Sequence, residues 1–315
     1  MEPTGGSGAT AELWKRRSWR SPAVASAAVL TGIDVADLTD ATALALAASD
    51  EARALLDGME LRIRTLPTTV ATSSERCVNS VRGPIMWAET ITARANALGN
   101  DDVFVCMTTA RSFDTVENQL LVEALDSIAA ASRALRGPTA ERLEADDAER
   151  IAEVAAEAAR WRAEDRLAGV KPHRLTGRAA ARLRGGHRRT RMAPIQAVRA
   201  RAREPFCAED VQGLADDWTE VLHRTVVRVL DAVGGPTVLT LSDGGLWCRA
   251  LSFRHPASSG SAPAGLALRG RPILPPRGAV DGAPWADELP SDGIRLTEDL
   301  GPDEIRKVLA QSRSS

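Results

Sequence analysis

The sequence predicts a helix-rich α+β fold, with a small mixed sheet, several long helices and a C-terminal β-hairpin. Alanine supplies much of the 44% apolar content, and alanine loses least on entering a helix. Apolar side chains recur at helical spacing through most of the chain. Two short runs, 103–106 and 236–255, are instead rich in strand-favouring residues, and the second contains the turn signal Ser242-Asp243-Gly244-Gly245.

Length and composition limit the classes of protein to which this chain can belong. The 315 residues suit one large domain or two ordinary ones, and a net charge of −2 argues against a general nucleic-acid binder. The four cysteines are scattered without a paired spacing, which excludes a disulfide framework or a zinc ribbon and predicts small buried side chains in a reducing compartment. No sequence pattern implies a cofactor or a metal site.

The first residues are expected to be a disordered start, 1–12, because they are rich in Gly, Ser and Thr. Basic residues at 15–20 precede a short apolar run at 22–30, a pattern that superficially resembles an export signal. The run is too short and periodic sequence follows it directly, so the sequence predicts a cytoplasmic protein without a membrane span.

Residues 21–56 are expected to be helical, with Gly58 as the stop signal. After that glycine the period changes, because Leu61, Ile63 and Thr65 alternate with arginines. Alternation of this kind indicates a half-buried strand, which Pro67 would end or place at an edge.

The next segment combines a turn, a helix, a strand and a second helix. Residues 81–87 read as an irregular turn entering a helix that closes at Gly99-Asn100, and 103–106 form a tightly bounded strand. Asp114 or Thr115 can cap the following helix. Its buried face is predicted to contain Leu120, Leu121, Ala124, Leu125 and Ile128.

A long charged helix is predicted over 136–170, with a narrow apolar stripe of Leu143, Ile151, Val154, Ala158 and Trp161. A solvated helix at one edge is one interpretation, and a coiled-coil or partner-binding helix is the other. The final segments are 171–255, a basic stretch followed by a helix over about 206–233 and the hairpin, and 256–315, a Pro/Gly-rich tail with a short terminal helix.

Two stretches, "VRGPIMWAETITARAN" and "VFVCMTTARSFDTVENQLLVEAL", carry a family resemblance. The chain resembles the McrC-like family of restriction-system proteins, in particular its uncharacterised McrBC component-like branch. The resemblance covers about 60–130, within an N-terminal α/β region of 13–135, and is faint over 170–235. The residues that carry it are Arg82, Gly83, Ile85, Trp87, Phe104, Phe113, Asp114, Glu117, Asn118, Leu120 and Leu121.

For these residues a structural role is expected. Gly83 permits a tight turn, Arg82 could pair with Asp114 or Glu117, and Asn118 could satisfy a backbone group at a helix end. With Trp87, the residues Arg82, Gly83, Asp114 and Asn118 are therefore predicted as a structural motif.

The resemblance also implies a PD-(D/E)xK nuclease domain, in which carboxylates hold Mg²⁺ beside a lysine. No Asp-x-Lys or Glu-x-Lys follows the hairpin, so 171–255 is interpreted as a degenerate, nuclease-like remnant without catalytic residues. The predicted function is a non-catalytic McrC-like component of a bacterial defence or DNA-processing system. It would bind DNA, an AAA+ or GTPase partner, or both.

Two alternatives stay open. One is a cryptic metal-dependent nuclease or hydrolase built from Asp216, Asp217 and Glu220, and the other is a scaffold that binds only proteins. DNA binding depends on the basic stretch, which has no acidic residue from Lys171 to Arg203, although its arginines could instead pair with acidic residues of 141–165. The predicted nucleic-acid-binding residues are Arg178, Arg182, Arg184, Arg188, Arg189 and Arg191.

Overall fold

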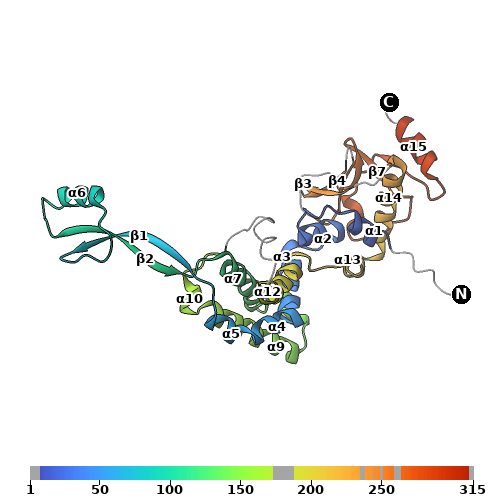
Figure 1. The fold of residues 1–315 in the computed structure, drawn as a ribbon. Helices are drawn as coiled ribbons and strands as arrows, with labels where there is room; N and C mark the ends of the chain where they lie inside the picture. The colour runs from blue at the N-terminus through green and yellow to red at the C-terminus, as the bar shows by residue number, and fades with distance from the viewer. Residues whose placement is uncertain are drawn as a thin grey trace. The chain divides into compact units, whose positions relative to one another are not determined.

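The computed structural model describes residues 8–172, 188–234, 238–242, 244–248, 251–258 and 264–311 (Figure 1). It is an α+β protein, as predicted, and it divides into two compact units. Unit 1 takes the residues up to Ala45, then Ala134–Leu143, then the residues from Ala200 onward. Unit 2 takes Leu46–Arg133 and Glu144–Arg199. The segments predicted from the sequence are contiguous, whereas these units join stretches that are far apart in the chain.

The helices of unit 1 pack around one apolar core. Leu222, Val226 and Leu230 of α14 are buried in that core, as their spacing predicts. The predicted helix over 206–233 is broken in two, because Asp216 caps α14 by accepting a hydrogen bond from the Thr219 amide at 2.6 Å. The helices that contribute to this unit are α1 (Ala9–Arg16), α2 (Ala23–Thr31), α3 (Val35–Ala47), η1 (Pro138–Arg142), α13 (Ala208–Leu214), α14 (Asp217–Val233) and α15 (Pro302–Gln311).

A meandering sheet closes the same core. Within the described residues its order is β3-β4-β5-β6-β7-β8, antiparallel except for the parallel pair β7–β8. Leu246 lies opposite Phe253, Phe253 opposite Leu266, and Leu266 opposite Ile273, so one buried apolar row crosses four strands. The strands are β3 (Thr240–Ser242), β4 (Gly245–Cys248), β5 (Leu251–Arg254), β6 (Gly265–Leu268), β7 (Arg271–Leu274) and β8 (Ile294–Arg295).

The predicted C-terminal tail, 256–315, is in fact part of unit 1. It supplies three strands of the sheet and α15, which packs against α14. Two arginines attach it: Arg228 Nη2 donates to the carbonyls of 297, 298 and 300, and Arg306 Nε donates to the Ala232 carbonyl at 2.6 Å. The short terminal helix predicted for this segment is confirmed as α15. Most of the sheet was missed, because strands of four residues separated by Gly and Pro turns have the composition of a linker.

The predicted disordered start, 1–12, also extends too far. Helix α1 begins at Ala9, and Thr10 and Ala11 are buried. Its first amides are satisfied by Glu220, more than two hundred residues later, so local composition carries no sign of this helix. The region expected to be helical over 21–56 contains three helices, and Gly32, at φ 73°, ends the first of them, α2.

Unit 2 contains a helical bundle. The apolar face predicted for α7 is confirmed, because all five of its residues are buried. The long helix predicted over 136–170 is divided into η1, α9 and α10, and of its stripe only Ile151 and Ala158 are fully buried. The helices of this unit are α4 (Asp50–Asp57), α5 (Met59–Arg64), α7 (Val116–Ala129), α8 (Ala131–Ala134), α9 (Ala145–Arg162), α10 (Asp165–Ala168) and α12 (Arg188–Arg203).

The strand expected around Leu61 and Ile63 is wrong. These residues belong to α5, where Met59 and Ile63, four positions apart, are buried and Leu61 is exposed. Helical spacing therefore decides the burial, and the alternation over Leu61, Ile63 and Thr65 is coincidental. Gly58 ends α4 as predicted.

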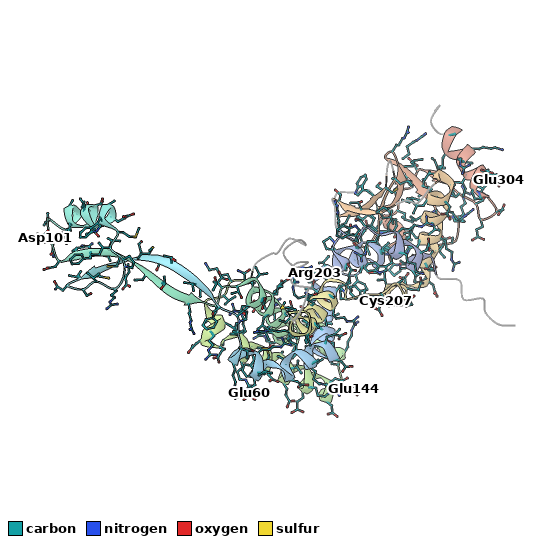
Figure 2. All side chains as sticks on the ribbon, viewed as in Figure 1. Glu60, Asp101, Glu144, Arg203, Cys207 and Glu304 are labelled. Carbon is teal, nitrogen blue, oxygen red and sulfur yellow. The ribbon has the colours of Figure 1, made fainter. Side chains whose placement is uncertain are left out.

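A two-stranded ribbon, called here the arm, projects from this bundle (Figure 1). Strands β1 (Thr69–Val78) and β2 (Val103–Ser112) pair antiparallel over ten residues, from Thr69↔Ser112 to Val78↔Val103. Helix α6 (Trp87–Asn96) lies between them in the chain and sits at the far end of the arm, where Figure 2 labels Asp101. Most residues of β1 are exposed, so the ribbon is covered on neither face along much of its length.

The cysteines follow the prediction with one exception. Cys77, Cys106 and Cys248 are buried free thiols, whereas Cys207 is exposed at the start of α13 (Figure 2). Across the described part of the chain, no helix combines the length and the apolar character needed to cross a lipid bilayer.

Candidate interaction surface on the β1–β2 arm

One buried side chain fastens the base of the arm to α7. Asn118 Nδ2 donates to the Pro67 carbonyl at 3.0 Å and to the Phe113 carbonyl at 2.7 Å. Pro67 lies just before β1 and Phe113 just after β2, so both strands are tied at the point where they leave the bundle. Thr115 is the residue that caps α7, accepting from the Asn118 amide at 3.3 Å. The predicted role of Asn118, satisfying backbone groups near a helix end, agrees with these bonds.

The Arg-Gly-Pro turn is followed by an isolated antiparallel β-bridge between Ile85 and Cys106 at the far end of the arm. Met107 N donates to the Pro84 carbonyl and Met86 N to the Val105 carbonyl, both at 2.8 Å. Residues 84–86 therefore run along the outer edge of β2. A Cβ atom at Gly83 would overlap the carbonyl oxygen of Met107, so only glycine lets the turn come this close.

Arg82 and Asp114, two other residues of the predicted motif, do not form an ion pair with each other. Arg82 Nη1 lies 3.3 Å from a Glu75 carboxylate oxygen, whereas Asp114 accepts from Gln119 Nε2 at 2.8 Å. Arg82 is at the far end of the arm and Asp114 at its base, with the length of β2 between them. The expected pair of Arg82 with Asp114 or Glu117 is therefore wrong. Both partners of the observed Arg82–Glu75 pair are exposed, so it contributes little stability.

The inner face of α6 is fixed to β2 by polar contacts. Thr90 is fully buried, and its hydroxyl accepts from the Val105 amide at 2.9 Å. Arg94 Nε donates to the Val103 carbonyl at 2.9 Å, and its guanidinium lies 4.8 Å from the centre of the Phe104 ring. The helix is thereby held in one orientation about its own axis.

One flank of α6, which begins next to Arg94 on the helix circumference, presents an apolar surface to solvent. We call Trp87, Ala88, Ile91 and Ala95 the α6 outer face, because they share an arc of roughly 100° on the helix. All four are exposed, and the two large members, Trp87 and Ile91, keep 60% and 66% of their surface accessible. The rest of the exposed circumference carries Glu89, Thr92 and Asn96, as is usual for a surface helix, whereas the apolar arc beside them is typical of an interaction site.

The predicted nucleic-acid-binding arginines do not form a described cluster. Arg178, Arg182 and Arg184 lie outside the described residues. Arg188 and Arg189 belong to α12 by their backbone, but their side chains are likewise outside the described part. Arg191 donates to the Thr65 carbonyl.

Arg191 also packs beside Arg62, which donates to the Arg191 carbonyl at 2.6 Å. Burial lowers the pKa of Arg62, and the positive charge of Arg191 lowers it further. Arg199, farther along α12, is buried and pairs with Glu123 of α7 at 2.9 Å rather than with the acidic residues of 141–165. Arg62 and Arg191 thus link α5 and the residue after it to α12, and Arg199 links α12 to α7.

The suspected catalytic carboxylate, Glu220, holds α1 in place. Its two oxygens accept from the amides of Ala9 at 2.5 Å and Thr10 at 3.1 Å, from the Thr10 hydroxyl at 2.8 Å and from Gln212 Nε2 at 3.0 Å. Burial alone would raise the pKa of Glu220, but these hydrogen bonds lower it below its ordinary value. A carboxylate here complements the positive N-terminal end of α1.

Two buried histidines lie beside this contact. His223 Nδ1 is 2.6 Å from the Thr10 hydroxyl, and His255 Nε2 is 2.9 Å from the hydroxyl of Thr219. Burial lowers the pKa of His223 to about 3 and that of His255 to about 4, so both rings are neutral at pH 7. This pair was not predicted from the sequence, because His223 belongs to α14 and His255 follows β5, far along the chain. The one local signal was Glu220 three positions before His223 on a helix.

Asp216 and Asp217, the other two carboxylates of the suspected site, are not arranged around a metal ion. Asp216 is occupied as the cap of α14, and Asp217 is exposed in its first turn. Among the described residues, no group of three or more His, Cys, Asp or Glu side chains is arranged to hold a metal ion.

Comparisons with known proteins found no matching family model, no matching curated protein and no matching solved structure. The McrC-like resemblance therefore stays a prediction from the sequence.

Proposed function

We propose that this chain is a non-catalytic, McrC-like component of a bacterial cytoplasmic defence or DNA-processing system. In this role the arm docks on a partner protein of the AAA+ or GTPase class. The observation that carries the proposal is the α6 outer face, an apolar surface of Trp87, Ala88, Ile91 and Ala95 that the rest of unit 2 leaves exposed.

The arm has the mechanical properties that a docking element needs. Its strands are joined by a ten-residue ladder, and Asn118 ties both strand ends to the bundle. Thr90 and Arg94 fix the rotation of α6 on β2. A preorganised helix face loses little conformational freedom on binding, so more of the contact energy remains as affinity. The binding mode would be a helix laid into an apolar groove, with Trp87 and Ile91 as the i and i+4 anchors.

The contacts of the suspected catalytic residues support a non-catalytic role. A general base or metal ligand must be free to meet a substrate or an ion, whereas both oxygens of Glu220 are occupied by α1 and Gln212. Glu220 thereby positions a helix in unit 1.

The docking experiment first searches the genes on either side of this one for an AAA+ or GTPase protein and uses that protein as the probe. The two proteins are co-expressed, and complex formation is measured by size-exclusion chromatography and calorimetry. Trp87→Ser and Ile91→Ser are each expected to weaken binding at least about tenfold, because large apolar anchors dominate such interfaces. Trp19→Ser is the matched control, since Trp19 is also exposed, at 79%, but belongs to unit 1. Binding that survives both α6 substitutions would overturn docking through this face.

DNA binding is the second candidate, supported by the basic stretch from Lys171 to Arg203. Fluorescence anisotropy on a DNA duplex at two salt concentrations tests it, because phosphate contacts make affinity fall steeply with salt. Binding that is strong at low salt and lost in Arg188→Ala/Arg189→Ala would establish this role. Plasmid nicking with Mg²⁺ or Mn²⁺ that Glu220→Ala abolishes, in protein that remains folded, would overturn the non-catalytic assignment.

A further inference from the structure

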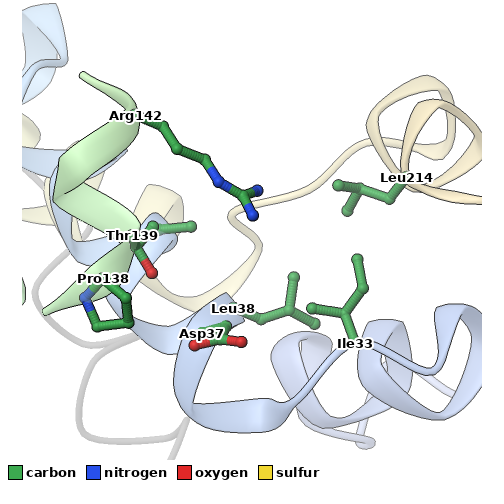
Figure 3. Close-up of a pocket in the computed structure, with 8 residues that line it drawn as sticks. Ile33, Asp37, Leu38, Pro138, Thr139, Arg142 and Leu214 are labelled. Carbon is green, nitrogen blue, oxygen red and sulfur yellow. The ribbon is translucent and has the colours of Figure 1, made fainter. Parts of the chain in front are cut away.

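Unit 1 contains a cavity of about 330 Å³ bounded by α3, η1 and the last residue of α13 (Figure 3). Its apolar wall includes Ile33, Leu38 and Leu214. Leu214 is 38% exposed, and its side chain borders this cavity. The apolar lining indicates a ligand with an aliphatic part.

Three polar groups complete the lining: the Arg142 guanidinium, the Asp37 carboxylate and the Thr139 hydroxyl. Figure 3 shows Arg142 reaching from η1 toward Leu38 and Leu214, with Asp37 below it on α3. In the part of the chain that the structure describes, neither Asp37 nor Arg142 makes a side-chain hydrogen bond or an ion pair, including with one another. Both side chains are exposed to solvent, so both charges are open to a ligand.

The signs of these charges narrow the ligand class. A simple anion would pair with Arg142 but would be repelled by the negative charge of Asp37. A simple cation would pair with Asp37 but would be repelled by the positive charge of Arg142. A molecule with one charge of each sign satisfies both residues. The volume is at the lower end of the range for small-molecule sites, which suits a molecule of amino-acid size.

We propose that this cavity binds a small aliphatic amino acid as its zwitterion. Its α-carboxylate accepts charge-assisted hydrogen bonds from Arg142, and its α-ammonium group donates to Asp37. Its branched side chain packs against Ile33, Leu38 and Leu214. This site is separate from the arm, and its occupancy does not depend on the function proposed above.

The test titrates the full chain with L-leucine by calorimetry and by ligand-observed NMR. Two analogues each lack one charge: 4-methylpentanoate lacks the ammonium group and 3-methylbutylamine lacks the carboxylate. Glycine lacks the side chain. Leucine is expected to bind saturably with a millimolar or lower Kd, and each analogue to bind at least about tenfold more weakly, because each leaves one protein group unpaired.

Matched variants assign each charge to its partner. Arg142→Met should remove the preference for leucine over 3-methylbutylamine, and Asp37→Asn should remove the preference for leucine over 4-methylpentanoate. Arg136→Met and Asp217→Asn are the controls, because both residues are exposed in unit 1 and outside the cavity lining. Circular dichroism checks that each variant is folded. Absence of saturable leucine binding, or binding that neither cavity variant changes, would overturn the proposal.

Discussion

His223 and His255 make the stability of unit 1 sensitive to mild acid. Their pKa values in the folded protein, about 3 and about 4, lie below the ordinary value of 6.5, so the unfolded chain takes up protons first as pH falls. The contribution of the two neutral histidines to the free energy of unfolding is therefore fully present above about pH 6.5. It declines as the pH falls toward their pKa values in the folded protein. At pH 5 the free energy of unfolding is expected to be lower by about 2 kcal/mol for each histidine.

Urea unfolding at pH 7, 6 and 5, followed by tryptophan fluorescence, measures this loss. Trp14 and Trp285, both buried in unit 1, report the transition. His223→Asn keeps a polar atom near the position of Nδ1 but cannot titrate, so its stability should depend on pH about half as strongly. Equal stability of the parent chain at pH 7 and pH 5 would contradict the neutral assignment.

At the level of the elements, the arm depends on the side-chain amide of Asn118. Asn118→Ala leaves the carbonyls of Pro67 and Phe113 without their donor, at an expected cost of about 1–3 kcal/mol. Because the two lost hydrogen bonds are at the base of the arm, hydrogen exchange should accelerate most for amides at the start of β1 and the end of β2. Gln119→Ala is the control, since among the described residues the bond of Gln119 Nε2 is to an exposed carboxylate, that of Asp114. Equal exchange in the two variants would show that Asn118 does not hold the strands.

Elements were predictable where local spacing decides burial. Helix α7 has a regular apolar face and a capping threonine, both visible in the sequence. Helix α1 and strands β6–β8 are held by distant partners such as Glu220, Arg228 and the sheet row through Phe253, which composition does not reveal. For the candidate site, the turn at Gly83 and the role of Asn118 were predictable. The exposure of Trp87 and Ile91 was not, because it depends on which side of α6 meets β2.

At the level of the whole molecule, the two units have separate cores and should unfold separately. Phe253→Ala removes a central side chain of unit 1 at an expected cost of about 3–5 kcal/mol, and Leu125→Ala does the same in unit 2 at about 2–5 kcal/mol. Scanning calorimetry should show two transitions, with each substitution lowering the midpoint of one. A single transition that both substitutions shift equally would mean that the units unfold as one.

The interleaving of the units has a consequence for synthesis on the ribosome. The last segment of unit 2 ends at Arg199, whereas α1 needs Glu220, 211 residues after Ala9. At about 5–20 residues per second, Glu220 is synthesised roughly ten to forty seconds after the first helix. Unit 2 is complete in the nascent chain before unit 1 has its core. A chain released near residue 200 would therefore carry a finished bundle and an unpartnered apolar start, which makes late truncation an aggregation hazard.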